Sequence, residues 1–398
     1  MPLPPYVKTV LRRLNEAGYE AYVVGGAVRS WLLNRPIHDY DITTNALPEQ
    51  IREVFSDRKI VDIGIKHGTV TIVDHKNTVE VTTYRTESGY TDHRHPDHVE
   101  YTGSVREDCA RRDFTVNALC YNPKEGVLDF FEGRKDLENR LIRAVNDPLE
   151  RFDEDALRIL RALRFAAQLE FAVEEKTKAA LLDKAEGLGY VSQERITGEL
   201  IKTFEAPGFP PILKEFPEIF ELLIPELREY DEAYRRRIED MIDHSPDNAV
   251  VRMALLLRGL DDVSRSDEIL RRLKYSNADR YAVTNLLACA KMPAETRIDI
   301  RRILNKLTVP EEQFIGFRCA LDPSVDQERL SSLCAAIRKD GDCYSLKQLE
   351  VTGKDLKELG LKGSRISMSI NACLNAVIEE QVPNTREDLM NYLRKLTG

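Results

Sequence analysis

The pattern of apolar residues changes once along the chain, near residue 147, and this change limits the folds that the sequence can adopt. Before it, short runs rich in β-branched residues are typical of strands, and they lie at residues 22–24, 39–42, 68–73 and 79–84. After it, apolar residues recur at helical spacing, with no strand pattern up to residue 398. The sequence therefore predicts a small mixed α/β region followed by a long helical one.

Two turn-forming sequences divide the helical part. Asp147 stands before Pro148, as an N-cap residue stands before a proline in the first turn of a helix. Residues 149–169 follow, with apolar side chains and arginines at helical spacing. A stretch rich in proline and glycine at residues 206–211 then predicts the clearest internal boundary. A chain of 398 residues exceeds one ordinary domain, which fits such a division.

The composition excludes several classes of protein. With 42% hydrophobic and 31% charged residues, the sequence is typical of a folded chain rather than a disordered one. No apolar run approaches the ~20 residues that span a bilayer, and the first residues lack the segments of a signal peptide. Seven cysteines without a Cys-x-x-Cys pair disfavour a disulfide framework and a zinc site. We therefore expect a protein of the reducing cytoplasm, with no membrane partner.

The net charge of −9 argues for a metabolic enzyme, because phosphate-binding proteins usually present a basic surface. Arginine-rich clusters occur nevertheless, at residues 235–237, 271–274 and 301–302. Each cluster is either a local basic surface or the solvated face of a helix, and charge alone does not decide between them. A polar stretch at residues 85–98, which contains His93, His95 and His98, predicts a mobile loop.

Asp39 and Asp41 stand two residues apart in a predicted strand, so their side chains point to one face while Tyr40 points to the other. Carboxylates at this spacing suit hard divalent cations, which prefer oxygen ligands. In a two-metal site the ions lie about 3.5–4 Å apart and bind the attacking and leaving oxygens of a phosphoryl transfer. Most such acidic pairs are exposed turn residues. The pair therefore indicates a metal site only together with the neighbouring motifs.

That context is a glycine pair at the end of the first predicted strand. Gly25 and Gly26 precede a short helix, where backbone N–H groups are able to approach a phosphate. Arg29 adds a charged donor one turn into this helix. A plain tight turn would explain the glycines alone, but not their position about a dozen residues before the acidic pair.

These segments resemble, in order, the motifs of the class II tRNA nucleotidyltransferase and bacterial poly(A) polymerase family, of the DNA polymerase beta superfamily. The similar segments are Gly-Gly-Ala-Val-Arg at 25–29, Asp-Tyr-Asp-Ile at 39–42, Arg-Arg-Asp-Phe-Thr-Val-Asn-Ala at 111–118, residues 129–137, Glu-Asp-Ala-Leu-Arg at 154–158 and Glu-Arg-Ile-Thr-Gly-Glu-Leu at 194–200. Ser30 departs from the family, which usually has Asp at that position.

The resemblance implies a fold and a reaction. The expected fold is an α+β nucleotidyltransferase head like that of DNA polymerase beta (residues 1–140), followed by an all-helical neck (141–206), body (207–300) and tail (301–398). The head would be catalytic, the neck would recognise the base and the tail would bind tRNA. The implied reaction is in-line attack of an RNA 3′-hydroxyl on an α-phosphate with release of pyrophosphate. Two Mg²⁺ ions held by Asp39 and Asp41 would assist it, with Glu80 as a candidate third carboxylate or else an exposed strand residue.

Asp155 and Arg158 lie three residues apart on a predicted helix, so we expect them to be neighbours on one face. They resemble the protein template of the family, in which Asp accepts from a base amino group and Arg donates to a ring nitrogen or carbonyl. Cytosine and adenine fit this pair, whereas two unsatisfied bonds to uracil or guanine would cost roughly 2–6 kcal/mol. CTP and ATP are therefore the expected substrates, and a surface ion pair is the alternative.

Other site residues follow from the same resemblance. Arg158, Arg161 and Arg164 recur every third residue and form a basic stripe, in which the last two would hold the nucleotide phosphates. A solvated basic face is the alternative. Arg112 would contact the nucleotide, and Asp113 would accept a hydrogen bond from the ribose 2′-hydroxyl. Gly26 and Arg29 complete the expected nucleotide site.

The choice within the family depends on segments outside these motifs. The stretch at 85–98 resembles the flexible loop of full CCA-adding members, and the chain lacks the long basic extension of poly(A) polymerases. Full CCA addition to tRNA is therefore expected, with A-only addition, CC-only addition and tailing as alternatives. Residues 353–356 and 360–365 resemble the tRNA-binding end of the family, or else serve core packing. Residues 252–258 lack a His-Asp pair, so we expect no phosphohydrolase activity.

Two hypotheses from other classes remain. A catalytically silent tRNA-binding protein would gain nothing from paired carboxylates, which are costly to desolvate. A metabolic nucleotidyltransferase would need neither the long helical region nor the pair Asp155 and Arg158. No obligate protein partner is expected.

Overall fold

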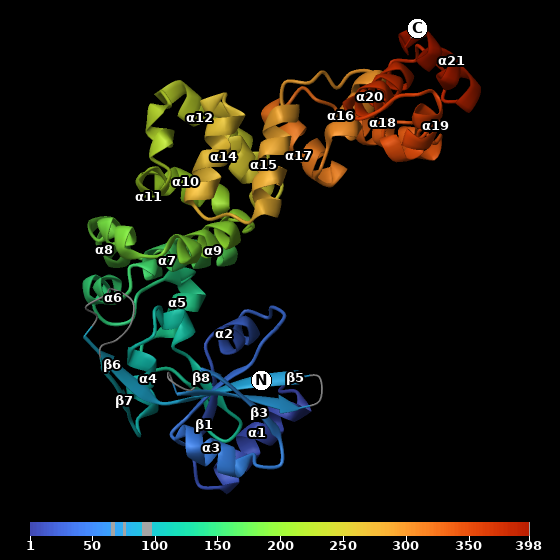
Figure 1. The fold of residues 1–398 in the computed structure, drawn as a ribbon. Helices are drawn as coiled ribbons and strands as arrows, with labels where there is room; N and C mark the ends of the chain where they lie inside the picture. The colour runs from blue at the N-terminus through green and yellow to red at the C-terminus, as the bar shows by residue number, and fades with distance from the viewer. Residues whose placement is uncertain (65–67, 75–76, 90–97, 398) are drawn as a thin grey trace. The chain divides into compact units, whose positions relative to one another are not determined.

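The computed structural model describes residues 1–64, 68–74, 77–89 and 98–397 (Figure 1). The chain divides into two compact units, Met1–Leu223 and Ile224–Gly398. Within the described residues, every strand lies in the first unit and the second unit is helical. The expected change from mixed α/β to helical structure is confirmed.

A seven-stranded sheet organises the N-terminal part of the first unit. Its strands follow the order β3-β4-β5-β2-β1-β8-β9. Neighbouring strands are antiparallel except β2 and β5, which are parallel. The strands are β1 Ala21–Val24, β2 Asp41–Thr44, β3 Lys59–Gly64, β4 Thr69–Asp74, β5 Asn77–Thr83, β8 Cys120–Asn122 and β9 Gly126–Leu128. The four predicted strands correspond to β1, β2, β4 and β5, with ends that differ by one or two residues.

Short helices cover this sheet. Every residue of β1 is buried, as expected of a central strand with helices on its two faces. In Figure 1, α1 and α3 lie below the sheet as drawn and α2 lies above it. The elements are α1 Pro5–Glu16, α2 Gly26–Leu32, α3 Pro48–Val54, α4 Val105–Ala110, η2 Thr115–Asn117 and α5 Gly133–Asn139.

The polar stretch at residues 85–98 begins and ends in strands rather than in a loop. β6 (Arg85–Ser88) pairs antiparallel with β7 (His98–Tyr101). The sequence pattern missed this hairpin because each strand has only four residues, β6 (Arg-Thr-Glu-Ser) contains no apolar residue, and all four residues of β7 are exposed. Residues 90–97, which include His93 and His95, lie outside the described residues.

The remaining helices of the first unit pack around α7. Eleven of the thirteen residues of α7 are buried, and α7 packs against α9 and α10. The elements are α6 Pro148–Glu154, α7 Leu157–Leu169, α8 Glu175–Asp183, η3 Ala185–Tyr190, α9 Gln193–Phe204, α10 Phe209–Glu215 and α11 Pro217–Leu223, with the short strands β10 Leu141–Ile142 and β11 Ala172–Val173. The predicted break at 206–211 is a turn within this unit.

One sequence prediction for this region is wrong. Residues 149–169 form two helices, because Asp155 is extended (φ −147°, ψ 102°) between α6 and α7. Its carboxylate accepts the backbone N–H of Leu157 (3.1 Å), and such a bond competes with continuation of a helix. The predicted start is confirmed, since the Asp147 side chain accepts from the N–H of Leu149 and Pro148 opens α6.

The second unit consists of helices. They are η4 Pro225–Glu229, α12 Glu232–Asp243, α13 Ala249–Leu257, η5 Arg258–Leu260, α14 Val263–Arg272, α15 Asn277–Cys289, α16 Arg297–Lys306, α17 Glu311–Leu321, α18 Gln327–Lys339, η6 Leu346–Gln348, α19 Gly353–Glu358, α20 Ser364–Ile378 and α21 Arg386–Thr397. Leu356, Cys373 and Leu389 belong to a core that joins α19, α20 and α21. Among the described residues, every helix is too short or too polar to span a bilayer.

Most arginines of the three basic clusters form ion pairs in this unit. The pairs are Arg236 with Glu232, Arg271 with Asp267, Arg272 with Glu226, Arg301 with Glu380 and Arg302 with Glu379. These acids neutralise much of the local positive charge. Most arginines of these clusters therefore form ion pairs within the protein and do not add to a basic surface.

Candidate active site

The acidic pair lies at the start of β2. Asp41 opens the strand and Asp39 precedes it; both are exposed, whereas Tyr40 between them is buried. The parallel register places Glu80 of β5 directly beside Asp41, and Glu80 is exposed as well. We call Asp39, Asp41 and Glu80 the acidic edge.

The charges of the acidic edge act on one another. Loss of water around Asp41 raises its pKa, and the negative charges of Glu80 and Asp39 raise it further against the opposing effect of Arg112. A cation bound there would relieve this repulsion, and oxygen ligands suit Mg²⁺. In the described part of the chain, no three acidic, histidine or cysteine side chains are already arranged as a metal site. The carboxylates fit a metal whose remaining ligands come from substrate phosphates and water.

The turn between β1 and α2 brings a second group of residues to the site. Gly25 has φ +70° and precedes Gly26, the first residue of α2. A Cβ atom on Gly25 would lie 3.6 Å from Nη1 of Arg112, which is an ordinary contact distance. A side chain would therefore be strained by the positive φ of the backbone and not by the guanidinium. Arg112 thus lies over the turn and also acts on the charge of Asp41.

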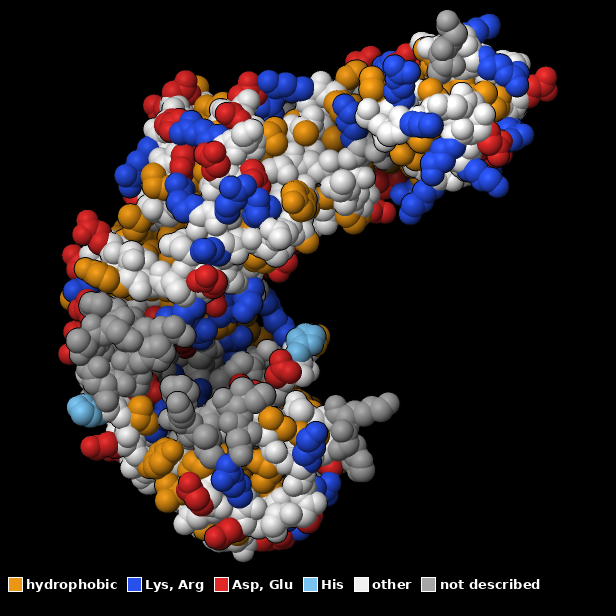
Figure 2. Space-filling model, in the orientation of Figure 1, with side chains coloured by type: hydrophobic (Ala, Val, Ile, Leu, Met, Phe, Trp, Pro, Cys, Tyr) orange, Lys and Arg blue, Asp and Glu red, His pale blue; other side chains and the backbone are white. Residues whose placement is uncertain are grey.

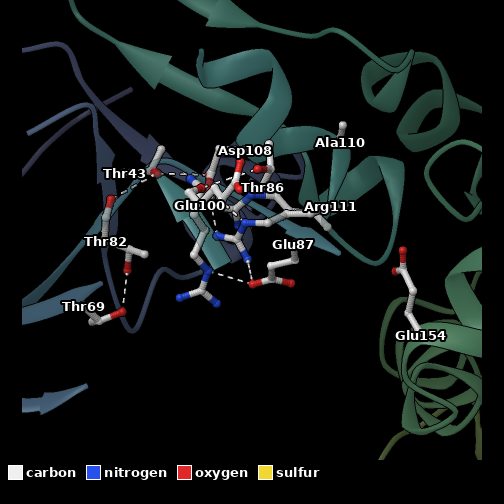
Figure 3. Close-up of polar contacts among 12 residues, drawn as sticks. Thr43, Thr69, Thr82, Thr86, Glu87, Glu100, Asp108, Ala110, Arg111 and Glu154 are labelled. Atoms are coloured by element: carbon white, nitrogen blue, oxygen red, sulfur yellow. Dashed lines mark hydrogen bonds and ion pairs between the residues drawn. The ribbon is translucent and has the colours of Figure 1, made fainter. Parts of the chain in front are cut away.

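A fully buried carboxylate holds Arg112 in this place. Asp108 accepts from Arg112 (Nη2, 3.2 Å), from Arg111 (Nη2, 2.7 Å) and from Thr43 of β2 (Oγ1, 3.0 Å). Figure 3 shows this cluster, in which Arg111 also reaches Glu87 of β6 (Nη1 to Oε1, 3.1 Å). Burial would raise the pKa of Asp108, but the two guanidinium groups outweigh it and lower this pKa. Asp108 therefore stays ionised. Its hydrogen bonds link Arg111 and Arg112 to Thr43 of β2, the strand that carries Asp41.

Asp113 is buried, and four donors already surround its carboxylate. Oδ1 accepts from the Phe114 N–H (2.8 Å) and from Nδ2 of Asn117 (3.0 Å). Oδ2 accepts from Nε (2.9 Å) and Nη2 (2.5 Å) of Arg161. Burial opposes the charge, but Arg161 and Asn117 lower the pKa of Asp113 to about 2. A ribose hydroxyl would have to replace one of these donors, because a carboxylate offers about four acceptor positions.

Asp155 and Arg158 are not neighbours on one helix, contrary to the sequence prediction, because α6 ends before Asp155 and α7 begins after it. Asp155 instead binds Arg195 of α9 (Nη2 to Oδ2, 2.7 Å). Arg158 is 9% exposed and pairs with Glu154. Its Nη2 also donates to the carbonyl of Arg111 (3.2 Å).

The predicted basic stripe is largely buried rather than solvated. Arg164 is 9% exposed and pairs with Glu199 of α9. Arg161 is partly exposed and pairs with Asp113. Arg29 of α2 donates to Oδ1 of Asn117. We call Arg29, Arg161 and Arg164 the arginine cluster, and Figure 2 shows Lys and Arg side chains gathered in the hollow of this unit between α9 and α2.

Sequence reasoning assigned no role to several residues that hold these groups. Phe165 lies beneath all three guanidinium groups of the arginine cluster. Asn117, Arg195 and Glu199 each bind a predicted site residue. All four lie within or directly after motifs that the sequence had singled out, but motif membership does not reveal which side chains meet.

Comparison with known proteins first defines the class. The family model of the Poly A polymerase head domain matches residues 21–143, which contain the acidic edge and the turn of Gly25. The model of tRNA nucleotidyltransferase domain 2 matches residues 248–393. The acidic edge and Arg112, within such a head domain, are typical of a nucleotidyltransferase.

Relatives then define the family. The chain is 36% identical over 388 residues to the CCA-adding enzyme of Lacticaseibacillus paracasei, covering 96% of this chain and 94% of that protein. It is also 36% identical over 403 residues to the CCA-adding enzyme of Lactobacillus helveticus (97% and 96%). The crystal structure of the Bacillus stearothermophilus CCA-adding enzyme in complex with CTP has a TM-score of 0.80 at 29% identity, with coverage of 99% and 98%. This chain belongs to the family of bacterial CCA-adding enzymes, which generally use a divalent metal.

Proposed function

We propose that this chain adds C, C and A to the 3′ end of tRNA from CTP and ATP, releasing pyrophosphate. The observation that carries the proposal is the arrangement of one unit, in which Arg112 lies between Asp41 of the acidic edge and the turn of Gly25. Carboxylates for a metal and arginines for phosphates are thereby placed around one turn. The relatives named CCA-adding enzyme, and the Bacillus stearothermophilus complex with CTP, support the same reaction.

We further infer that Asp39 and Asp41 hold Mg²⁺ in a two-ion site, with Glu80 as a third carboxylate. When bound, the ions would neutralise charge that develops on the α-phosphate and the attacking 3′-hydroxyl. The mutual repulsion of the acidic edge and its exposed oxygens support this assignment. Thr43, held by Asp108, fixes the strand that carries Asp41.

The nucleotide would lie between the acidic edge and α7. We infer that Gly26 and the arginine cluster bind its phosphates, that Asp113 accepts from its ribose 2′-hydroxyl, and that Asp155 and Arg158 recognise its base. Arg112 would also contact the nucleotide. Asp155 is partly exposed, and its Oδ2 accepts a hydrogen bond from Nη2 of Arg195 (2.7 Å). The partition into head (1–140), neck (141–206), body (207–300) and tRNA-binding tail (301–398) follows the same inference. Because each of the seven cysteines is free, we place the protein in the reducing cytoplasm.

The decisive experiment offers two RNAs to the purified protein: a tRNA that lacks its terminal CCA, and the same tRNA ending in CC. Each is incubated with labelled CTP alone, ATP alone, or both. We expect CTP incorporation on the first RNA and a single ATP incorporation on the second. Failure to incorporate CTP on any RNA would leave A-only addition, and long A tails would indicate a poly(A) polymerase.

The metal assignment has its own test. We expect Asp39→Ala and Asp41→Ala to abolish incorporation while tRNA binding is retained, and EDTA to abolish it in the wild type until Mg²⁺ is restored. Asp183→Ala, which removes an exposed carboxylate at the end of α8, is the matched control and should remain active. Activity that survived in both variants of the acidic edge would show that the metal lies elsewhere, and loss of tRNA binding in them would indicate a structural role.

A further inference from the structure

One aromatic ring contacts the three segments that are expected to bind the nucleotide. The guanidinium carbons of Arg164, Arg29 and Arg161 lie 3.9, 4.8 and 5.4 Å from the centroid of the Phe165 ring. The ring also meets Phe114, which follows Asp113, in an edge-on contact at 5.8 Å. Phe165 therefore joins α2, α7 and the segment of Asp113, which are far apart in the sequence.

The charges around this ring do not balance. Asp113 pairs with Arg161 and Glu199 pairs with Arg164, whereas Arg29 donates to the neutral amide oxygen of Asn117. Among the described residues, no acceptor reaches the buried Nε atom of Arg29. Burial lowers the pKa of Arg29 to about 10, and the positive charges of Arg164 and Arg161 lower it further against the opposing charge of Asp113. Three cations thus lie together with two carboxylates, whose ion pairs are with Arg161 and Arg164 and not with Arg29.

The face of an aromatic ring carries partial negative charge and attracts a guanidinium within about 6 Å of its centroid. An aliphatic side chain of similar size would fill the space but would offer no such charge. Phe165 is 6% exposed, so this attraction acts with little competition from water.

We propose that Phe165 is a positioning residue for the incoming nucleotide, because its π face holds Arg29, Arg161 and Arg164 in place to bind the triphosphate. The inference rests on the proposed function, since the nucleotide triphosphate is the anion that Arg29 would bind. It adds that the aromatic character of residue 165, and not only its bulk, determines affinity for phosphates.

The test compares an aromatic with an aliphatic replacement. In Phe165→Tyr the ring is kept, and we expect the KM for CTP and for ATP to stay within about 2-fold of the wild type. In Phe165→Leu the π face is lost, and we expect both KM values to rise about 10-fold, with the KM for tRNA unchanged. Binding of inorganic tripolyphosphate to the free protein should weaken by a similar factor, because the arginines hold phosphates rather than the base. Phe165→Met, which fills more space without a ring, replaces the leucine variant if that protein does not fold.

A matched control separates positioning from packing. Phe220 is buried in the same unit, where it packs against Phe204 and Phe209, so Phe220→Leu should lower the Tm without raising the KM for either nucleotide. Equal KM values in Phe165→Leu and Phe165→Tyr would overturn the inference, as would unchanged tripolyphosphate binding in the leucine variant. A wild-type protein that binds neither CTP nor tripolyphosphate would instead overturn the proposed function and this inference with it.

Discussion

Asp113, Arg158 and Arg164 each have protein partners before any nucleotide is bound. Such residues are held in place at the cost of burying charge, which is tolerated only where the charge is paired. Side chains that are already held in position would lose less conformational entropy when the substrate binds, which would favour catalysis. The sequence predicts that these residues belong to the site, and the structure adds the partners that hold them.

The carboxyl group of Asp113 should make the stability of the first unit depend on pH. Its pKa in the folded protein is about 2, against an ordinary value of 3.8. A lowered carboxyl pKa stabilises the folded state above pH 3.8, and this stabilisation is lost as the pH falls through 2. The shift corresponds to about 2 kcal/mol at neutral pH.

Asp113→Asn should therefore lower the free energy of unfolding by about 2 kcal/mol at pH 7 and by roughly half as much at pH 3. Urea unfolding of the two proteins, followed over this pH range, measures the difference. A difference that did not vary with pH would mean that packing, and not the charge of Asp113, stabilises the fold.

At the scale of elements, the break between α6 and α7 decides where the residues proposed to recognise the base lie. Apolar spacing through residues 149–169 predicts one helix, since periodicity reports a buried face but not an interruption. The interruption arises because Asp155 bonds to the N–H of Leu157 and to Arg195 on a different helix. Arg195 stands forty residues later in the chain, so no local pattern links the two.

Arg195 should consequently control base selection. We expect Arg195→Ala to leave Asp155 without its fixed orientation and to reduce the preference for CTP over UTP about 10-fold. Competition assays on tRNA lacking CCA measure this ratio. Lys202→Ala, at an exposed position of the same helix α9, is the control and should keep the preference. An unchanged ratio with a lowered Tm would limit Arg195 to a structural role.

At the scale of the whole molecule, the division at Leu223 separates the predicted chemistry from most of the predicted tRNA-binding surface. The acidic edge and the arginine cluster both lie in Met1–Leu223, and so do all their described hydrogen-bond partners. The net charge of −9 is compatible with the proposed phosphate binding, because the three residues of the arginine cluster supply positive charge locally, whereas the net charge is a sum over the whole chain.

Residues 1–223 expressed alone should therefore fold and bind CTP with an affinity within about 3-fold of the full chain, by ordinary additivity of separate sites. Binding of tRNA should be much weaker, because the predicted tail is absent. Calorimetry with CTP and gel-shift titration with tRNA check the two parts separately. Loss of CTP binding by a folded fragment would show that the second unit contributes to the nucleotide site.

The sequence by itself determined the fold class, the strands β1, β2, β4 and β5, the start of α6 and the acidic pair. These features depend on local periodicity, capping and the two-residue repeat of a strand. Only the tertiary structure decided the hairpin of β6 and β7, the break at Asp155, the placement of Glu80 beside Asp41 and the position of Phe165 beneath three arginines. The physical reason is that the contacts of Glu80 with Asp41, of Arg195 with Asp155 and of Phe165 with Arg29 join segments far apart in the chain, which leaves no periodic trace in the sequence, while the strands of the hairpin are short and β7 is exposed.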